Sequence, residues 1–279
     1  MLRTGAPRRT VARVVALALA LTVLAVGGVR PAGAAGPSVL LVYSAYSAQS
    51  DHSTNVADGL TATGQVGTVT TFDGGAATPS ASDLVGIDVV MVMADGGWND
   101  KAALGDLLAD FVDAGGTVVE TTFTLYCAGE MGLAGRWASG GYGALIGPNP
   151  DCPNQLDGDG PLGFVATDAS SPLLAGVTTF NGGTSSYRNV VGVAPGATLV
   201  ARWDDEDDTP FAAWTAAHTG CVVGLNFYPP SSDASEDFWD ATTDGFVLQA
   251  NAVNFACGAT PPPPPPEPEP VVVEPTFTG

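Results

Sequence analysis

Residues 86–124 read GIDVVMVMADGGWNDKAALGDLLADFVDAGGTVVETTFT, and this stretch decides the fold of the 279-residue chain. The uninterrupted apolar run at residues 89–93 predicts a buried strand over residues 88–93. Across residues 100–114, leucine, phenylalanine and valine recur at three- and four-residue spacing, which predicts an amphipathic helix. A Gly-Gly pair ends that helix, and residues 117–124 predict a second buried strand. Together they form one βαβ unit of a parallel sheet.

Similar patterns extend this sheet in both directions along the chain. Apolar or Val/Thr-rich runs predict further strands at residues 38–43, 66–72 and 162–167. Three strands at hairpin spacing follow, at residues 197–203, 211–216 and 221–227. Amphipathic patterns predict helices at residues 54–63 and 244–256, whereas the Gly-, Pro- and Asn-rich residues 126–160 predict a long irregular segment. We therefore expect an α/β domain over residues 35–258: a flavodoxin-like three-layer sandwich with a mainly parallel central sheet and an antiparallel C-terminal extension.

Both ends of the chain have compositions unlike that of the domain. Residues 1–34 combine four early arginines, a 13-residue apolar run and a small-x-small site, which predicts a cleaved signal peptide. Arg8-Arg9 leaves a twin-arginine route open, although the residues after it match that pattern poorly. Residues 259–279 predict an extended Pro-rich linker or stalk, at which a further module could begin. We expect an extracellular or envelope-associated protein that does not span the membrane after processing.

The charge of the chain is strongly acidic. Nine basic residues stand against 29 acidic ones, a net charge of −20, and loss of residues 1–34 would leave four against 29, a net charge of −25. Such a surface repels phosphate backbones, so nucleic acid is not an expected partner. The four cysteines favour disulfides in an oxidising compartment. Of the three connectivities that they allow, we favour Cys127 with Cys152 and Cys221 with Cys257.

Several segments resemble a known family. LADFVDAGGTVV at residues 108–119 is similar to the helix, Gly-Gly, strand junction of the class I glutamine amidotransferase-like fold, particularly its trehalose-utilisation-like branch in secreted bacterial form. SPLLAGV at residues 171–177 resembles a turn of the same branch. ATLVARW at residues 197–203 and VVGLNFY at residues 222–228 resemble its later strands. The resemblance covers residues 39–256 and implies the α/β fold predicted above.

The amidotransferase chemistry is not supported by the corresponding residues. Those enzymes place a nucleophile on a Gly-x-Cys-x-Gly elbow backed by a histidine and a carboxylate. Here the elbow reads Leu125-Tyr126-Cys127-Ala128-Gly129, without the first glycine, and His218 has no glutamate two residues later. A structural disulfide is therefore the preferred role for Cys127.

Candidate site residues follow from the rule that ligands collect at the carboxyl ends of parallel strands. Asp51 and His52 follow the first predicted strand in a polar loop, and Asp95, Trp98 and Asn99 follow the third. His52 and Asp95 are the candidate acid–base pair, since imidazole titrates near neutrality. The alternative for His52 is a solvated surface side chain.

A second group of candidates lies in the long irregular segment. Trp137 and Tyr142, together with Trp98, could bind a glycan through flat aromatic faces, oriented by Arg136 and Asn99. Aromatic rings in a Gly-rich loop serve equally as packing anchors.

Two acidic segments raise the question of a metal. Residues 157–160 and 204–208 carry carboxylates that suit calcium, but neither completes an EF-hand loop. We therefore predict no cofactor, with calcium as an alternative.

These observations favour an exported, non-catalytic module of the amidotransferase-like fold that binds an envelope glycan or a protein partner. The alternative is a secreted hydrolase acting on a sugar or amide bond through His52 and Asp95. The sequence does not indicate an oligomeric state.

Overall fold

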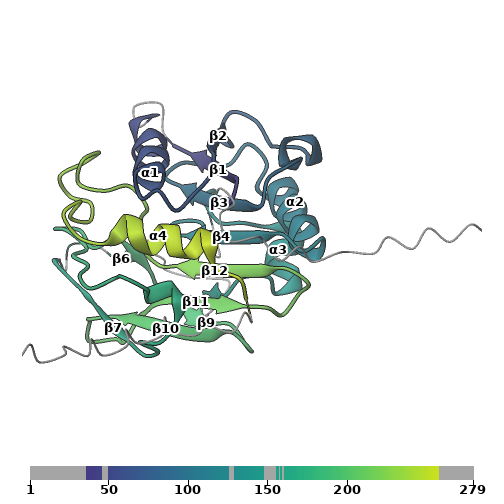
Figure 1. The fold of residues 1–279 in the computed structure, drawn as a ribbon. Helices are drawn as coiled ribbons and strands as arrows, with labels where there is room; N and C mark the ends of the chain where they lie inside the picture. The colour runs from purple at the N-terminus through teal and green to yellow at the C-terminus, as the bar shows by residue number, and fades with distance from the viewer. Residues whose placement is uncertain are drawn as a thin grey trace, which may run out of the picture. The chain divides into compact units, whose positions relative to one another are not determined.

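A computed structural model describes residues 36–45, 50–125, 129–147, 155–156, 158 and 160–257. Within them, one mixed sheet has the strand order β2-β1-β3-β4-β12-β11-β10-β7 (Figure 1). The parallel strands are β2 (Val69–Asp73), β1 (Val39–Ser44), β3 (Val89–Ala94), β4 (Thr117–Thr121) and β12 (Cys221–Leu225). The antiparallel extension consists of β11 (Pro210–Thr215), β10 (Thr198–Trp203) and β7 (Phe164–Ala166). The predicted fold class is confirmed.

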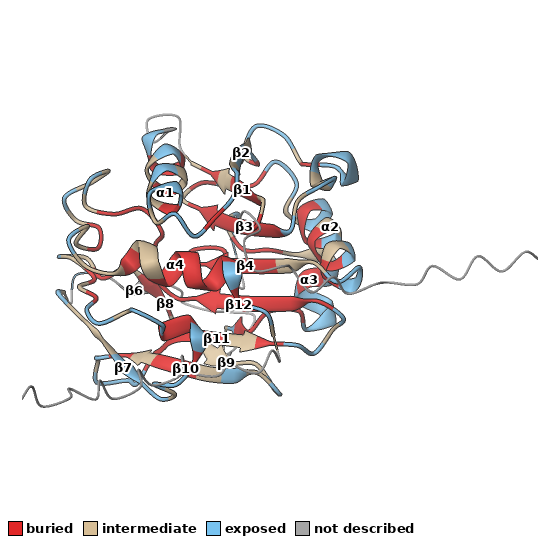
Figure 2. Ribbon diagram, in the orientation of Figure 1, coloured by how far each residue is buried: buried red, intermediate tan, exposed pale blue. Residues whose placement is uncertain are grey.

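Helices cover both faces of the sheet. Helices α1 (Ser50–Ala62) and α4 (Gly245–Asn254) lie on one face, and α2 (Lys101–Asp113) and α3 (Gly135–Gly140) lie on the other. Alternate residues of each central strand point into the two layers, so Leu41 packs with the first pair of helices and Leu40 with the second. Figure 2 shows the central strands mostly buried; β3 and β12 are buried along their whole length, and β1 and β4 each have one half-buried position. Coverage on both faces explains why these strands read as continuous apolar runs.

Helix α2 has the boundaries that its end signals predict. The Asp100 carboxylate caps it by accepting hydrogen bonds from the N–H groups of Ala102 and Ala103 at 3.0 and 2.9 Å. Gly115, with φ of +97°, reverses the chain at the other end. The buried face is rotated from the prediction, because α3 packs directly on Gly105, where a Cβ would lie 2.0 Å from the Ala134 carbonyl oxygen. Leu107 and Phe111 are only half-buried as a result.

Two predictions about local structure are wrong. Helix α1 begins at Ser50 rather than near residue 54, so His52 lies on a helix and not in a surface loop. The segment expected to be irregular contains α3 and the short strands β5 (Leu145–Ile146) and β6 (Gln155–Leu156). These strands pair with β9 (Gly192–Val193) and β8 (Arg188–Asn189), 30 or more residues later, so local sequence could not reveal them.

Two short 3₁₀ helices, η1 (Ala81–Leu84) and η2 (Pro172–Leu174), complete the described elements.

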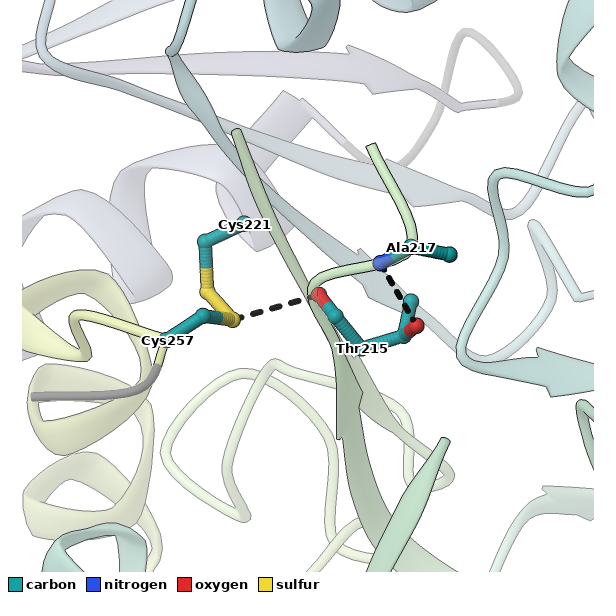
Figure 3. The surroundings of a disulfide bond; sticks show 4 residues. All are labelled: Thr215, Ala217, Cys221 and Cys257. Atoms are coloured by element: carbon teal, nitrogen blue, oxygen red, sulfur yellow. Dashed lines mark hydrogen bonds between the residues drawn. A yellow bond between two sulfur atoms is a disulfide. The ribbon is translucent and has the colours of Figure 1, made fainter. Parts of the chain in front are cut away.

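One predicted disulfide is present. Cys221 opens β12 and is bonded to Cys257, just beyond α4, across 36 residues (Figure 3). The Cys257 Sγ also lies 3.2 Å from the Thr215 carbonyl oxygen on β11. The bond therefore fixes the end of the last helix to the centre of the sheet. Cys127 and Cys152 lie outside the described residues.

No helix among the described residues is long and apolar enough to cross a membrane.

Replacing both Cys221 and Cys257 by serine should lower the free energy of unfolding by about 3–4 kcal/mol, because a loop of this length is no longer closed in the unfolded chain. Urea denaturation of the variant and of the native protein, each with and without reductant, measures the loss. Reductant should lower the urea midpoint of the native protein at least as far, because it opens Cys221–Cys257 together with the predicted Cys127–Cys152 bond. An unchanged urea midpoint in the double variant would contradict a stabilising role for this bond.

Candidate functional site

A cavity of about 330 Å³ lies where β3, β4 and β12 end. We call it the carboxyl-edge cavity. Its walls come from α1, from the residues just after these three strands, and from the loops before β8 and α4. The described lining residues are His52, Asp95, Phe123, Tyr187, Tyr228, Ala234, Ser235, Asp237 and Phe238. The cavity thus occupies the edge at which open α/β sheets collect ligands.

His52, Tyr228 and Asp95 form a connected polar group in this cavity. The Nδ1 atom of His52 lies 3.0 Å from the Tyr228 hydroxyl and 3.8 Å from the Asp95 carboxylate. Burial lowers the pKa of His52, although Asp51 and Asp237 oppose this effect. Burial, together with the charge and hydrogen bond of Asp95, holds the pKa of Tyr228 well above its usual value. At neutral pH the imidazole is therefore uncharged and the phenol keeps its proton.

The hydrogen bond between His52 and Tyr228 links the protonation of the two side chains. A neutral imidazole carries one hydrogen, so Nδ1 either donates it to the phenol oxygen or accepts the hydrogen of the phenol. When Nδ1 is the donor, Nε2 is an acceptor that can take a hydrogen from a hydroxyl or act as a base.

Asp237 supplies a second carboxylate with a different environment. It accepts hydrogen bonds from the hydroxyls of Ser235 and of Tyr187, the latter at 2.9 Å. Burial alone would raise the pKa of Asp237, but these hydrogen bonds outweigh it and hold the pKa below its usual value. Asp237 is therefore ionised at neutral pH and acts as a fixed acceptor.

Aromatic rings make up most of the remaining wall. Phe123 lies 5.7 Å from Tyr187 and 5.3 Å from Tyr228, centroid to centroid. Phe238 packs edge-to-face on Tyr228 and on His52, each at 5.0 Å. The cavity therefore combines apolar ring surfaces with two carboxylates, a neutral imidazole and two phenols.

The structure brings together only part of the predicted site. His52 and Asp95, the predicted pair, line the same cavity. Asp51 lies outside it, in an open groove beside α1. Asn99 is exposed and donates to the Thr78 hydroxyl at 3.0 Å, and Trp98 is buried with its indole N–H donating to the Met131 carbonyl oxygen.

The expectation of exposed aromatic faces is wrong for Trp98, Trp137 and Tyr142, which are 6%, 5% and 4% exposed. Tyr142 stacks between Trp137 and His218, at 5.6 and 3.7 Å. Arg136 pairs with Asp110 and Asp113 of α2. These contacts hold α3 against α2. They agree with the second interpretation of the sequence, in which the aromatic rings stabilise the packing of this segment.

Several cavity residues were missed by sequence reasoning. Tyr228 follows a predicted strand, so the strand-end rule would have found it. Tyr187, Asp237 and Phe238 come from loops that give no sequence signal.

Cys127, Asp157 and Asp159 lie outside the described residues, so the nucleophile and calcium hypotheses stay predictions. In the described part of the chain, no group of three or more His, Cys, Asp or Glu residues could hold a metal ion.

Comparison of the fold with solved structures gives matches at low sequence identity. A cytoplasmic protein of Salmonella typhimurium matches with a TM-score of 0.58 and 14% identity, over 78% of this chain and 98% of that one. A ThuA-like protein of Parabacteroides merdae matches with a TM-score of 0.54 and 12% identity, over 79% and 90%. A second cytoplasmic protein of Salmonella typhimurium gives a TM-score of 0.53 and 12% identity, over 78% and 96%.

These similarities support the predicted resemblance at the level of the fold. The chain shares its fold with the ThuA-like protein and with the two cytoplasmic proteins. No protein-family model and no curated protein matches the sequence.

A further carboxylate is buried away from this cavity. Glu120 of β4 is 2% exposed and accepts hydrogen bonds from the N–H groups of Ala144 and Leu145 at 2.8 and 3.3 Å. It also accepts one from the indole N–H of Trp137 at 3.2 Å. Burial raises the pKa of Glu120 to about 7, although these hydrogen bonds oppose it. An acid in a predicted buried strand otherwise made of Val, Thr and Phe was the sequence signal for this group.

Glu120 should make the stability of the protein depend on pH. Between pH 4.5 and 7 the unfolded chain has lost the Glu120 proton while the folded protein retains it, so the free energy of unfolding falls as pH rises. The fall should total about 3 kcal/mol and be complete by about pH 8, one unit above the folded-state pKa. Urea denaturation of the native protein and of Glu120→Gln at pH 4.5, 6 and 8 isolates this contribution. Parallel stability profiles for the two proteins would show that Glu120 titrates normally.

Proposed function

We propose that this chain is an exported binding module whose carboxyl-edge cavity takes a neutral sugar unit of a cell-envelope glycan. The observation that supports this proposal is the convergence of Asp95, Asp237 and His52 with aromatic rings around one cavity of about 330 Å³. Ligand pockets start at about 300 Å³ and combine apolar walls with a few placed polar groups.

The chemistry of the lining suits a polyhydroxyl compound. The carboxylates and Nε2 of His52 accept hydrogen bonds, and sugar hydroxyls donate them. The faces of Phe123, Tyr187 and Phe238 offer apolar surface to the C–H groups of a sugar ring. The described lining residues include two acids and no lysine or arginine, which disfavours anionic sugars.

Export is supported by two further features. The first 34 residues have the composition of a signal peptide. The Cys221–Cys257 disulfide is of a kind that persists in oxidising compartments. A protein so exported would meet envelope glycans.

Isothermal titration calorimetry with neutral mono- to tetrasaccharides, including glucose, mannose and N-acetylglucosamine series, tests the proposal. At least one series should bind. Asp237→Asn should weaken that binding about tenfold or more, because it removes a charged hydrogen-bond acceptor from the cavity. Tyr187→Ala should also weaken it, because it removes a ring face and a donor to Asp237.

Glu236→Gln is the matched control. It removes one negative charge at the neighbouring, exposed position without touching the cavity, and should leave binding unchanged. The proposal fails if no saccharide binds, or if Asp237→Asn and Glu236→Gln behave alike.

A second candidate function is hydrolysis of a sugar or amide bond. It is favoured by the 3.8 Å approach of His52 and Asp95, since a neutral imidazole beside a carboxylate can accept a proton from water. Saccharides that bind should then be cleaved, and His52→Gln should lower kcat at least 100-fold with little change in KM. Binding without product, detected by mass spectrometry after prolonged incubation, would exclude this candidate and leave the binding proposal intact.

A further inference from the structure

A second cavity, of about 320 Å³, lies on the face of the sheet covered by α2 and α3. We call it the β4–α3 cavity. Its described lining residues are Glu120, Thr124, Leu125, Leu133, Trp137, Ala138, Gly141, Gly143, Leu145, Ile146 and Gly147. It shares none of these with the carboxyl-edge cavity. Ala138 and Gly141 are exposed, so the cavity opens to solvent at the end of α3.

The walls of this cavity are mostly apolar. Leu125, Leu133 and Leu145 are buried, and Ile146 is 39% exposed at the opening. Trp137 adds an indole ring whose N–H already donates to Glu120. Such walls favour a ligand with an apolar body.

Glu120 is the one acidic side chain among the described lining residues, and no lysine, arginine or histidine is among them. Its Oε1 atom accepts hydrogen bonds from two backbone N–H groups. Its Oε2 atom accepts one, from Trp137, whereas a carboxylate oxygen can accept about two. The carboxylate therefore retains an acceptor position and has no basic side chain in the cavity to pair with.

A buried carboxylate without a cation is costly, and an added cation would recover part of that cost. The protein as a whole has a net charge of −20, so its field attracts cations to such an opening. Positive charge also interacts favourably with the face of a tryptophan ring.

We propose that the β4–α3 cavity binds a small organic cation, a primary amine with an apolar body, whose ammonium group pairs with Glu120 while its body packs against Leu125, Leu133 and Leu145. This site is separate from the proposed glycan site, and either can exist without the other.

The pair benzylamine and benzyl alcohol tests this proposal, because the two have the same ring and differ in charge. Isothermal titration calorimetry at pH 8 with the full chain should show benzylamine binding at least tenfold more tightly than benzyl alcohol. Glu120→Gln keeps the size of the side chain and a hydrogen-bond acceptor but removes the charge, and should abolish this preference. The variant should still bind benzyl alcohol as the native protein does, which shows that it is folded.

The pH dependence gives an independent readout. The ammonium pairs with ionised Glu120, whose pKa is about 7, so benzylamine affinity should rise about tenfold per pH unit from pH 5 to near 7 and level off by pH 8. At pH 6 binding should release close to one proton, measured from the calorimetric heats in buffers of different ionisation enthalpy. Benzyl alcohol binding should show neither effect.

Ala138→Phe, which places a ring in the opening without touching Glu120, should block both compounds. It should leave saccharide binding at the carboxyl-edge cavity unchanged. The proposal is overturned if benzylamine does not bind, if it binds no better than benzyl alcohol, or if Glu120→Gln retains the preference for the amine.

Discussion

The parallel pairing of β4 with β12 is the interaction on which the rest of the structure depends. These strands lie about a hundred residues apart in sequence, and β12 also pairs antiparallel with β11, so the β4–β12 pairing connects the N-terminal parallel strands to the antiparallel extension. Their register places Thr121 opposite Leu225, so the two strands end side by side at the same edge of the sheet. The residues that follow, Phe123 and Tyr228, are therefore neighbours with ring centroids 5.3 Å apart. The carboxyl-edge cavity is a direct consequence of this register.

Asn226 extends that pairing into the loops. Its side-chain oxygen accepts hydrogen bonds from the Thr122 hydroxyl at 2.9 Å and the Asn189 N–H at 2.7 Å. Its amide group donates to the carbonyl oxygens of Asn189 and Pro210. The side-chain amide of Asn226 is fully buried, and all four of its hydrogen-bonding positions are used. Asn226 thus connects β12, β11 and β8 beside the cavity. This connection brings Tyr187, two residues before Asn189, to the cavity wall.

The sequence predicts the parts of this structure that depend on local pattern. Apolar runs indicate the central strands, the Gly-Gly pair ends α2, and the strand-end rule brings His52 and Asp95 to one edge. Tyr187 and Asp237 could not be predicted, since their positions depend on hydrogen bonds such as those of Asn226 between distant segments. The burial of Trp137 and Tyr142 also escaped prediction. The short helix α3 is held by contacts with α2 and Glu120, and its own Gly-rich sequence gives little helical signal.

Two acids of the chain, the half-buried Asp237 and the buried Glu120, illustrate how environment decides the role of a carboxylate. Asp237 is surrounded by hydroxyl donors and stays ionised, as a ligand acceptor should. Glu120 has hydrogen bonds as well, but complete burial dominates and raises its pKa to about 7. The first suits a neutral polar ligand, and the second suits a ligand that brings its own positive charge.

The most direct test of the glycan-binding account uses the two histidines of the chain, His52 and His218. His52 lines the carboxyl-edge cavity. His218 stacks on Tyr142 beside Asp113 and is not among the described residues that line this cavity. In a protein labelled with ¹⁵N-histidine, NMR signals of both rings can be followed while a neutral saccharide is added. The account predicts that the Nε2 signal of His52 shifts in a saturable manner and that His218 does not respond. Saccharide binding that leaves His52 unchanged would contradict it.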